Sequence, residues 1–137
     1  MTPTILCIDD DSGFTRMIQD TLTPKGFAVF VAPSVRDALV IVRMIELDLI
    51  LLDIMLPDID GFSFMELLSA EPRNRNVPVL VLSGCITDDA RRLAQECGAV
   101  AFVQKPFQLH RLVSLVQRTI ASHRASAADA QTVTASE

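Results

Sequence analysis

The chain has 137 residues, 50% of them hydrophobic, which is enough for one compact domain with a buried core and excludes a wholly disordered chain. Its 12 basic and 17 acidic residues give a net charge of −5, which argues against attraction to the phosphates of nucleic acids. No apolar run approaches the roughly 18 residues of a membrane helix and no secretory pattern follows Met1, so we expect a soluble cytoplasmic protein.

The N-terminal part of the chain predicts a strand followed by a helix. Residues 4–8 form a short apolar run that ends at the aspartates 9–11, a pattern typical of a strand buried on both faces of a parallel sheet. Apolar residues then recur at helical spacing over residues 14–22. Ser12 is available as the N-cap of this helix, and residues 24–26, Pro-Lys-Gly, are a stop signal.

The same alternation continues to residue 120. Thr87 is expected to cap the fourth helix and Gly98 to end it. The remaining strands are expected at residues 27–31, 49–52, 77–82 and 99–103, and the remaining helices at residues 34–45, 62–68, 87–97 and 109–120.

Strict alternation of five strands and five helices predicts a single-domain α/β fold. We expect a doubly wound, parallel five-stranded sheet with helices on both faces and right-handed crossovers, formed by residues 1–121. Residues 122–137 are rich in Ala, Ser and Thr and lack an apolar period, which indicates a tail or the start of a linker. The abundant alanine leaves open a helical extension of the last element.

Polar residues follow four of the five predicted strands at the same end. Asp9 and Asp10 follow the first strand, Asp53 the third, Ser83 ends the fourth, and Lys105 follows the fifth. Because the carboxyl ends of parallel strands form one edge of the sheet, these side chains should converge. Taken singly, each is more often structural, since an aspartate after a strand commonly caps the next helix, a role open to Asp11 and Asp10 here. Their joint placement favours a functional site.

The residue types at this edge indicate phosphoryl chemistry. Three carboxylates repel one another unless they are protonated or neutralised by a hard cation, and oxygen-only ligands favour Mg²⁺ or Mn²⁺. Asp53 is the best candidate nucleophile, because a carboxylate that attacks phosphorus gives an acyl phosphate. Lys105 could supply a positive charge, and Ser83 a hydrogen bond, to the phosphoryl oxygens.

The chain resembles the receiver domain of two-component response regulators over roughly residues 4–121. The resemblance rests on the segments at residues 8–11, 51–61, 81–84 and 102–107. The chain resembles chemotaxis-type and phosphorelay receivers, which implies a flavodoxin-like sheet with strand order 2-1-3-4-5.

The resemblance implies a role for each matching residue. Asp53 is the implied phosphoacceptor and Lys105 the partner of the phosphoryl group, while Ser83 and Phe102 are the implied switch residues. The implied Mg²⁺ ligands are Asp9 (through water), Asp10, Asp53 and the backbone carbonyl of Met55.

The resemblance also implies a phosphorylation-activated signalling switch that catalyses only its own phosphorylation and dephosphorylation. A histidine kinase or a histidine phosphotransfer protein would donate the phosphoryl group. The surface of the fourth helix, fifth strand and fifth helix would then change and control a downstream protein or an output domain missing from this sequence. Neither nucleic acid nor a membrane is expected to bind this segment directly, and a homodimer formed on phosphorylation is left open.

Two other functions compete with this interpretation. One is a hydrolase of small phosphate esters with an aspartyl nucleophile, but such enzymes usually need a second acid two positions later, where this chain has Met55. The other is a phosphorylation-independent pseudo-receiver scaffold, which the complete set of acidic, hydroxyl and lysine positions disfavours. The side chains of Met55 and Cys85 hold an attacking water poorly, so we expect an aspartyl phosphate of at least moderate lifetime.

Overall fold

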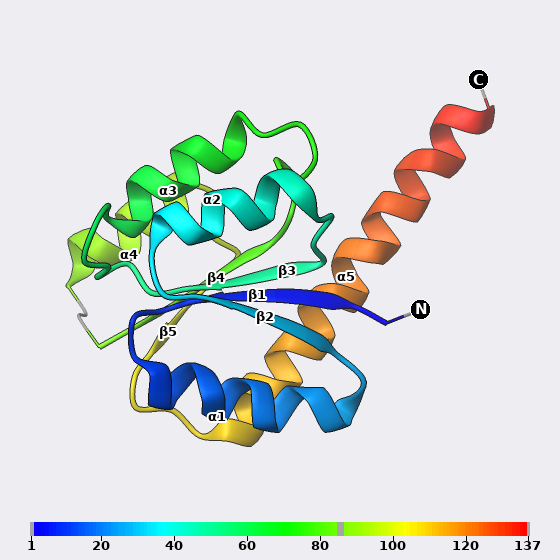
Figure 1. Ribbon diagram of the computed structural model, residues 1–137. Coiled ribbons are helices and arrows are strands. Elements are labelled where there is room, and N and C mark those ends of the chain that lie inside the picture. The colour runs from blue at the N-terminus through cyan, green and yellow to red at the C-terminus, as the bar shows by residue number, and fades with distance from the viewer. Residues whose placement is uncertain (1, 85–86, 137) are drawn as a thin grey trace.

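The computed structural model describes residues 2–84 and 87–136, with side chains as far as residue 126 (Figure 1). A short 3₁₀ helix, η1 (Thr23–Lys25), follows the first α-helix. The other elements are β1 (Thr4–Ile8), α1 (Ser12–Leu22), β2 (Ala28–Ala32), α2 (Val35–Met44), β3 (Leu49–Leu52), α3 (Gly61–Ser69), β4 (Val79–Ser83), α4 (Asp88–Glu96), β5 (Ala101–Gln104) and α5 (Leu109–Ser136).

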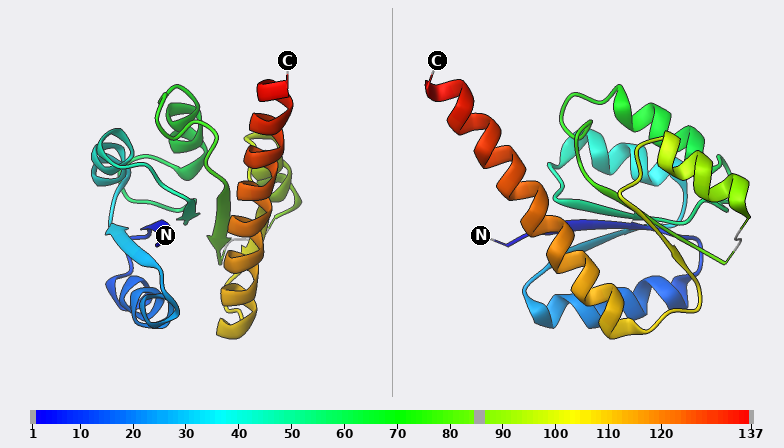
Figure 2. Two further views of the ribbon diagram at one scale, coloured as in Figure 1. Left: turned by 90° about the vertical axis from the view of Figure 1, so that its right-hand side faces the viewer. Right: turned by 180° about the vertical axis from the view of Figure 1, so that it is seen from behind.

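The five strands form one parallel sheet in the order β2-β1-β3-β4-β5. The predicted α/β class and strand order 2-1-3-4-5 are therefore confirmed. Figures 1 and 2 show α1 and α5 on one face of the sheet and α2, α3 and α4 on the other. The strand order reverses between β1 and β3, which is the position where ligands bind in open sheets of this kind.

The core consists of two apolar layers, one on each face of the sheet. Every residue of β3 and β4 is buried. In β1, Ile5 and Cys7 belong to the layer beneath α1 and α5, whereas Leu6 and Ile8 belong to the layer beneath the other three helices. This division follows from the alternation of side chains along a strand. Each fully buried aliphatic side chain contributes about 1.5–3 kcal/mol to stability.

Side chains cap the N-termini of α1, α2, α3 and α4, and the N-cap of α1 is not the residue that we predicted. Ser34 and Thr87 cap α2 and α4, and the capping role of Thr87 is as predicted. Ser12, however, is the first residue of α1, and its expected N-cap role is wrong. Asp11 is the cap, because its backbone is extended and its carboxylate accepts a hydrogen bond from the N–H of Phe14 at 3.1 Å.

The predicted bounds of β1 and β3 are confirmed, whereas those of β2, β4 and β5 differ from the observed ones by one or two residues. Gly98 follows α4 with φ of 96°, as expected of the residue that ends a helix. The N–H of Ala99 then bonds to the carbonyl of Ala94 at 2.9 Å, so β5 begins only at Ala101. β4 likewise begins two residues after its predicted start, behind Pro78, and β2 lies one residue further along the chain.

Helix α5 continues to Ser136, so the helical extension left open above is what the structure shows. Arg124 in this extension pairs with one oxygen of Asp48 at 3.2 Å, and the other oxygen accepts a hydrogen bond from the N–H of Thr4 at 2.7 Å. These contacts attach the extension to the amino-terminal edge of the sheet. Within the described part of the chain, no helix has both the length and the apolar character that a membrane crossing requires.

Candidate functional site

Backbone hydrogen bonds continue the sheet one residue past the strand ends and so place three of the predicted site residues. These bonds run from the N–H of Asp9 to the carbonyl of Ala32 at 3.1 Å, from Asp53 to Ile8 at 3.0 Å, and from Lys105 to Ser83 at 2.9 Å. Because β1, β3, β4 and β5 are successive neighbours in the sheet, their carboxyl ends present these residues at one edge.

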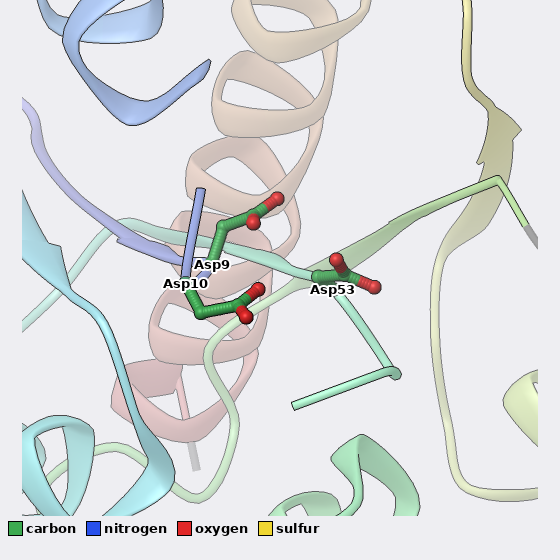
Figure 3. Close-up of side chains that lie close together, drawn as sticks. All are labelled: Asp9, Asp10 and Asp53. Atoms are coloured by element: carbon green, nitrogen blue, oxygen red, sulfur yellow. The ribbon is translucent and has the colours of Figure 1, made fainter. Parts of the chain in front are cut away.

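Three carboxylates meet at this edge, as predicted. One oxygen each of Asp9, Asp10 and Asp53 lies within 4.8 Å of the others. Figure 3 shows Asp9 and Asp10 on the segment that follows β1 and Asp53 on the segment that follows β3. Asp9 is only 2% exposed, Asp53 is half-buried and Asp10 is exposed, so the group opens toward solvent on the Asp10 side.

Lys105 lies between two of these carboxylates. Its ammonium nitrogen is 2.5 Å from Asp9 Oδ2 and 3.5 Å from Asp53 Oδ2. The other oxygen of Asp9 accepts a hydrogen bond from the N–H of Asp11 at 2.9 Å, so the buried carboxylate is bonded at both oxygens. Although burial opposes the charge of Lys105, the hydrogen bond and charge of Asp9, together with Asp53, raise its pKa above the ordinary value.

The surroundings of Asp53 disfavour the ionised form of its carboxyl group. Burial raises its pKa above the ordinary value, and the nearby charge of Asp9 acts in the same direction. The N–H of Met55, which donates to Asp53 Oδ1 at 3.0 Å, and the ammonium of Lys105 lower the pKa without offsetting this effect. Additional positive charge beside Asp53 would therefore stabilise the ionised carboxylate.

The donor set fits a hard divalent cation. Three carboxyl groups gather at this cluster, and the ammonium of Lys105 contacts two of them, Asp9 and Asp53. Carboxylate oxygens without nitrogen or sulfur ligands are the set that Mg²⁺ and Mn²⁺ prefer. Burial is the main cause of the raised pKa of Asp53, and a cation bound beside it would favour the ionised carboxylate.

The predicted switch residues lie on the two strands next to the carboxylates. Ser83 is fully buried at the end of β4. Phe102 pairs with Val81 across β4 and β5, packs against the core layer beneath α4, and has the Arg91 guanidinium 5.5 Å from its ring centroid. Their switch roles, and the metal-binding role of the Met55 carbonyl, stay predictions.

The two positions expected to govern the lifetime of an aspartyl phosphate differ in what the structure describes. The Met55 side chain is 63% exposed beside Asp53. Cys85 lies outside the described residues. The expected lifetime stays a prediction.

The loop between β3 and α3 is held by contacts that the sequence analysis missed. The carboxylate of Asp58 accepts hydrogen bonds from the N–H groups of Val35 and Arg36, both at 3.1 Å, at the start of α2. Although desolvation acts to raise it, these bonds lower the pKa of Asp58. The N–H of Gly61 donates to the carbonyl of Ile54 at 3.0 Å, and a Cβ at Gly61 would lie 2.7 Å from Ile54 Cα. A glycine in an irregular segment is the one sequence signal for such a close approach.

Comparisons with known proteins give similarities of sequence and of fold. Residues 5–117 match the family described as "Response regulator receiver domain". The regulatory protein AtoC of Escherichia coli (strain K12) is 33% identical over 117 residues, which are 85% of this chain and 25% of AtoC. The uncharacterized transcriptional regulatory protein YcbL of Bacillus subtilis (strain 168) is 30% identical over 115 residues, 84% of this chain and 50% of YcbL.

Among solved structures, the chemotaxis protein CheY4 of Vibrio cholerae superposes with a TM-score of 0.82 at 25% identity, over 87% of this chain and 99% of CheY4. The present chain thus spans half or less of the two curated relatives but nearly the whole of this solved domain.

Proposed function

The chain belongs to the response regulator receiver domain family of two-component signalling, and we propose that it is a switch operated by Mg²⁺-dependent phosphorylation of Asp53. One observation carries the proposal. The half-buried carboxylate of Asp53, with a raised pKa, lies within 4.8 Å of oxygens of Asp9 and Asp10 and 3.5 Å from the ammonium of Lys105. A nucleophile, a cation site and a positive charge for the phosphoryl group are thus adjacent.

In the proposed reaction, a carboxylate oxygen of Asp53 forms a bond to phosphorus. The bond from phosphorus to the histidine nitrogen of the donor breaks, and the nitrogen keeps the electron pair. Lys105 pairs with a phosphoryl oxygen. Mg²⁺, held by Asp10 directly, by Asp9 through water, and by Asp53 and the Met55 carbonyl, would supply the charge that offsets the carboxylates and the phosphoryl oxygens.

The second part of the proposal concerns the surface formed by α4, β5 and α5. The hydroxyl of Ser83 bonds to a phosphoryl oxygen and draws the following loop inward. Phe102 then changes its position and leaves the Arg91 guanidinium that now lies over its ring. The neighbouring placement of Ser83 and Phe102 on paired strands supports this coupling. A partner would read the changed surface.

We assign the donor role to a histidine kinase or a histidine phosphotransfer protein, and the receiving role to a downstream protein or an output domain. The names of AtoC and YcbL as regulatory proteins support an output in regulation. Within this chain the switch is assigned to residues 1–121, and residues 122–137 to a helical tail or the start of a linker. We place the protein in the cytoplasm.

The test of this proposal is labelling by a small-molecule phosphoryl donor. With acetyl phosphate and Mg²⁺, the wild-type protein should gain one phosphoryl group in its intact mass, and Asp53→Asn should gain none, because the amide is no nucleophile toward phosphorus. Asp20→Asn, at an exposed position of α1, is the matched control and should be labelled like the wild type. Stoichiometric labelling of Asp53→Asn would overturn the assignment.

The same preparations distinguish the switch from a hydrolase. The exposed Met55 thioether offers no proton for a leaving group, so wild-type protein should not turn over a generic phosphomonoester. Sustained Asp53-dependent release of phosphate from such an ester would favour the hydrolase instead.

A further inference from the structure

Lys105 contacts an aromatic ring in addition to the two carboxylates. Its ammonium nitrogen lies 4.0 Å from the centroid of the Phe14 ring. A cation within about 6 Å of a ring face is attracted by the negative face of the aromatic quadrupole. The ammonium therefore has favourable contacts with Asp9 and Asp53 on one side and with Phe14 on another.

The Phe14 ring is held by two separate segments of the chain. Its backbone N–H donates to the Asp11 cap at 3.1 Å, which fixes the first turn of α1. The ring meets Phe107 edge to face, with centroids 6.0 Å apart and an interplanar angle of 83°. Phe107 follows Lys105 by two residues, so the aromatic pair joins α1 to the segment that carries the lysine.

From this geometry we propose that Phe14 is a positioning residue for Lys105. The ring holds the ammonium at the carboxylate cluster and keeps water from its ring-facing side, and the Lys105 side chain is only 23% exposed. A lysine has a flexible four-carbon stem, and fixing its ammonium before the reaction reduces the entropy lost in the transition state. The inference rests on the proposed role of Lys105 in phosphoryl transfer.

A Phe14 ring that only packs in the core and a ring that also positions Lys105 should respond differently to substitution. Phe14 also packs against the core layer beneath α1 and α5, so loss of its volume lowers stability in either case. Leucine keeps much of this volume without the aromatic quadrupole, whereas tyrosine keeps the ring face. An effect that acts through Lys105 must disappear when position 105 carries no ammonium.

The first experiment measures this coupling in metal-free protein. Urea unfolding of wild type, Phe14→Leu, Lys105→Gln and the double variant is followed by far-ultraviolet circular dichroism, since the chain contains no tryptophan or tyrosine. We expect a coupling of about two- to thirtyfold in the unfolding equilibrium constant. Additive effects of the two substitutions would overturn the inference, because the ring would then act by packing alone.

The second experiment measures phosphorylation by acetyl phosphate. Phe14→Leu should lower the maximal rate by about two- to thirtyfold while the dissociation constant for Mg²⁺ stays within about twofold, and Phe14→Tyr should restore the rate. Phe62→Leu, which removes a half-buried ring from α3, is the matched control and should react like wild type.

The phosphorylation rates of the wild type and of Phe14→Leu show whether the role of Phe14 or the proposed function is at fault. An unchanged rate in Phe14→Leu, with the wild type phosphorylated, overturns the inference alone. Failure of the wild type to become phosphorylated overturns the proposed function, and with it the part of Phe14 in phosphoryl transfer, while the unfolding cycle still decides whether Phe14 holds Lys105.

Discussion

Asp53 illustrates how a single half-buried carboxylate links reactivity to stability. Burial and the charge of Asp9 disfavour its ionised form and raise its pKa above that of an aspartate in the unfolded chain. In the pH range between the unfolded and the folded pKa, the folded state binds more protons than the unfolded state, so stability falls as pH rises. Above the folded pKa the full penalty is present, and below the unfolded pKa it is absent.

We therefore predict that Asp53→Asn is more stable than the wild type at pH 7 in the presence of EDTA. The difference should narrow as the pH falls through the raised pKa of Asp53 toward the ordinary aspartate value, because the wild-type carboxyl group then becomes neutral. Urea unfolding at a series of pH values measures both effects. Asp20→Asn should show no comparable gain, and a wild type more stable than Asp53→Asn at pH 7 without metal would contradict the prediction.

In excess Mg²⁺ the wild type should become more stable than Asp53→Asn. A cation that binds only the folded wild-type site stabilises it by mass action, whereas the amide of Asp53→Asn removes one ligand and the charge that attracts the ion.

At the scale of elements, the loop between β3 and α3 joins Asp53, the proposed phosphoacceptor, to α2 and α3. Asp58 caps the first two N–H groups of α2 from this loop. Asp60 caps α3 through the N–H of Ser63 at 2.9 Å. The loop that carries Met55 is thus held at two helix ends, so its backbone is positioned beside Asp53 without any bound ligand.

The close approach of Gly61, the first residue of α3, to Ile54 in the preceding loop predicts a specific cost for a side chain at position 61. In Gly61→Ala, the new Cβ would lie 2.7 Å from Ile54 Cα, so the backbone must shift, at a cost of about 1–3 kcal/mol in the free energy of unfolding. Gly13→Ala, in α1, meets nothing closer than 3.4 Å and should gain about 0.5–1 kcal/mol. Urea unfolding compares the two variants, and a Gly61→Ala protein as stable as wild type would show that the approach is looser than described.

At the scale of the whole molecule, the described side chains of the α5 extension, residues 121–126, lie outside the two core layers. Among the described side chains, the α5 residues of the core end at Ile120, and the ion pair between Arg124 and Asp48 is partly exposed on both sides. A partly exposed ion pair contributes about 0–1 kcal/mol. The assignment of the folded unit to residues 1–121 therefore makes a quantitative prediction.

A chain that ends at residue 121 should unfold cooperatively, with a free energy of unfolding within about 1 kcal/mol of the full chain, and should be labelled like it by acetyl phosphate. Arg124→Ala in the full chain measures how much the ion pair with Asp48 contributes to the free energy of unfolding. Urea unfolding of the truncated chain and of Arg124→Ala tests whether residues 1–121 form the folded unit. Loss of cooperative unfolding on truncation would show that residues 122–136 belong to it.

The sequence was most informative where topology alone decides position. Asp9, Asp53 and Lys105 could be placed together because each follows a strand of one parallel sheet. The Phe14–Lys105 contact could not be predicted, since Phe14 occupies an ordinary apolar position of a helix and only the packed structure gives the direction of its ring. The sequence left both Asp11 and Ser12 as candidate caps of α1, because both residue types are good caps and only the local backbone decides between them.

The measurement that tests the proposed switch most directly is the identification of the modified residue. Protein treated with acetyl phosphate and Mg²⁺ is reduced with borohydride, which converts an aspartyl phosphate to homoserine, and its peptides are sequenced by mass spectrometry. We predict homoserine at position 53 alone, and none when EDTA replaces Mg²⁺. Modification at another aspartate, or equal modification of Asp53 without a divalent cation, would contradict a metal-dependent phosphoacceptor at this edge of the sheet.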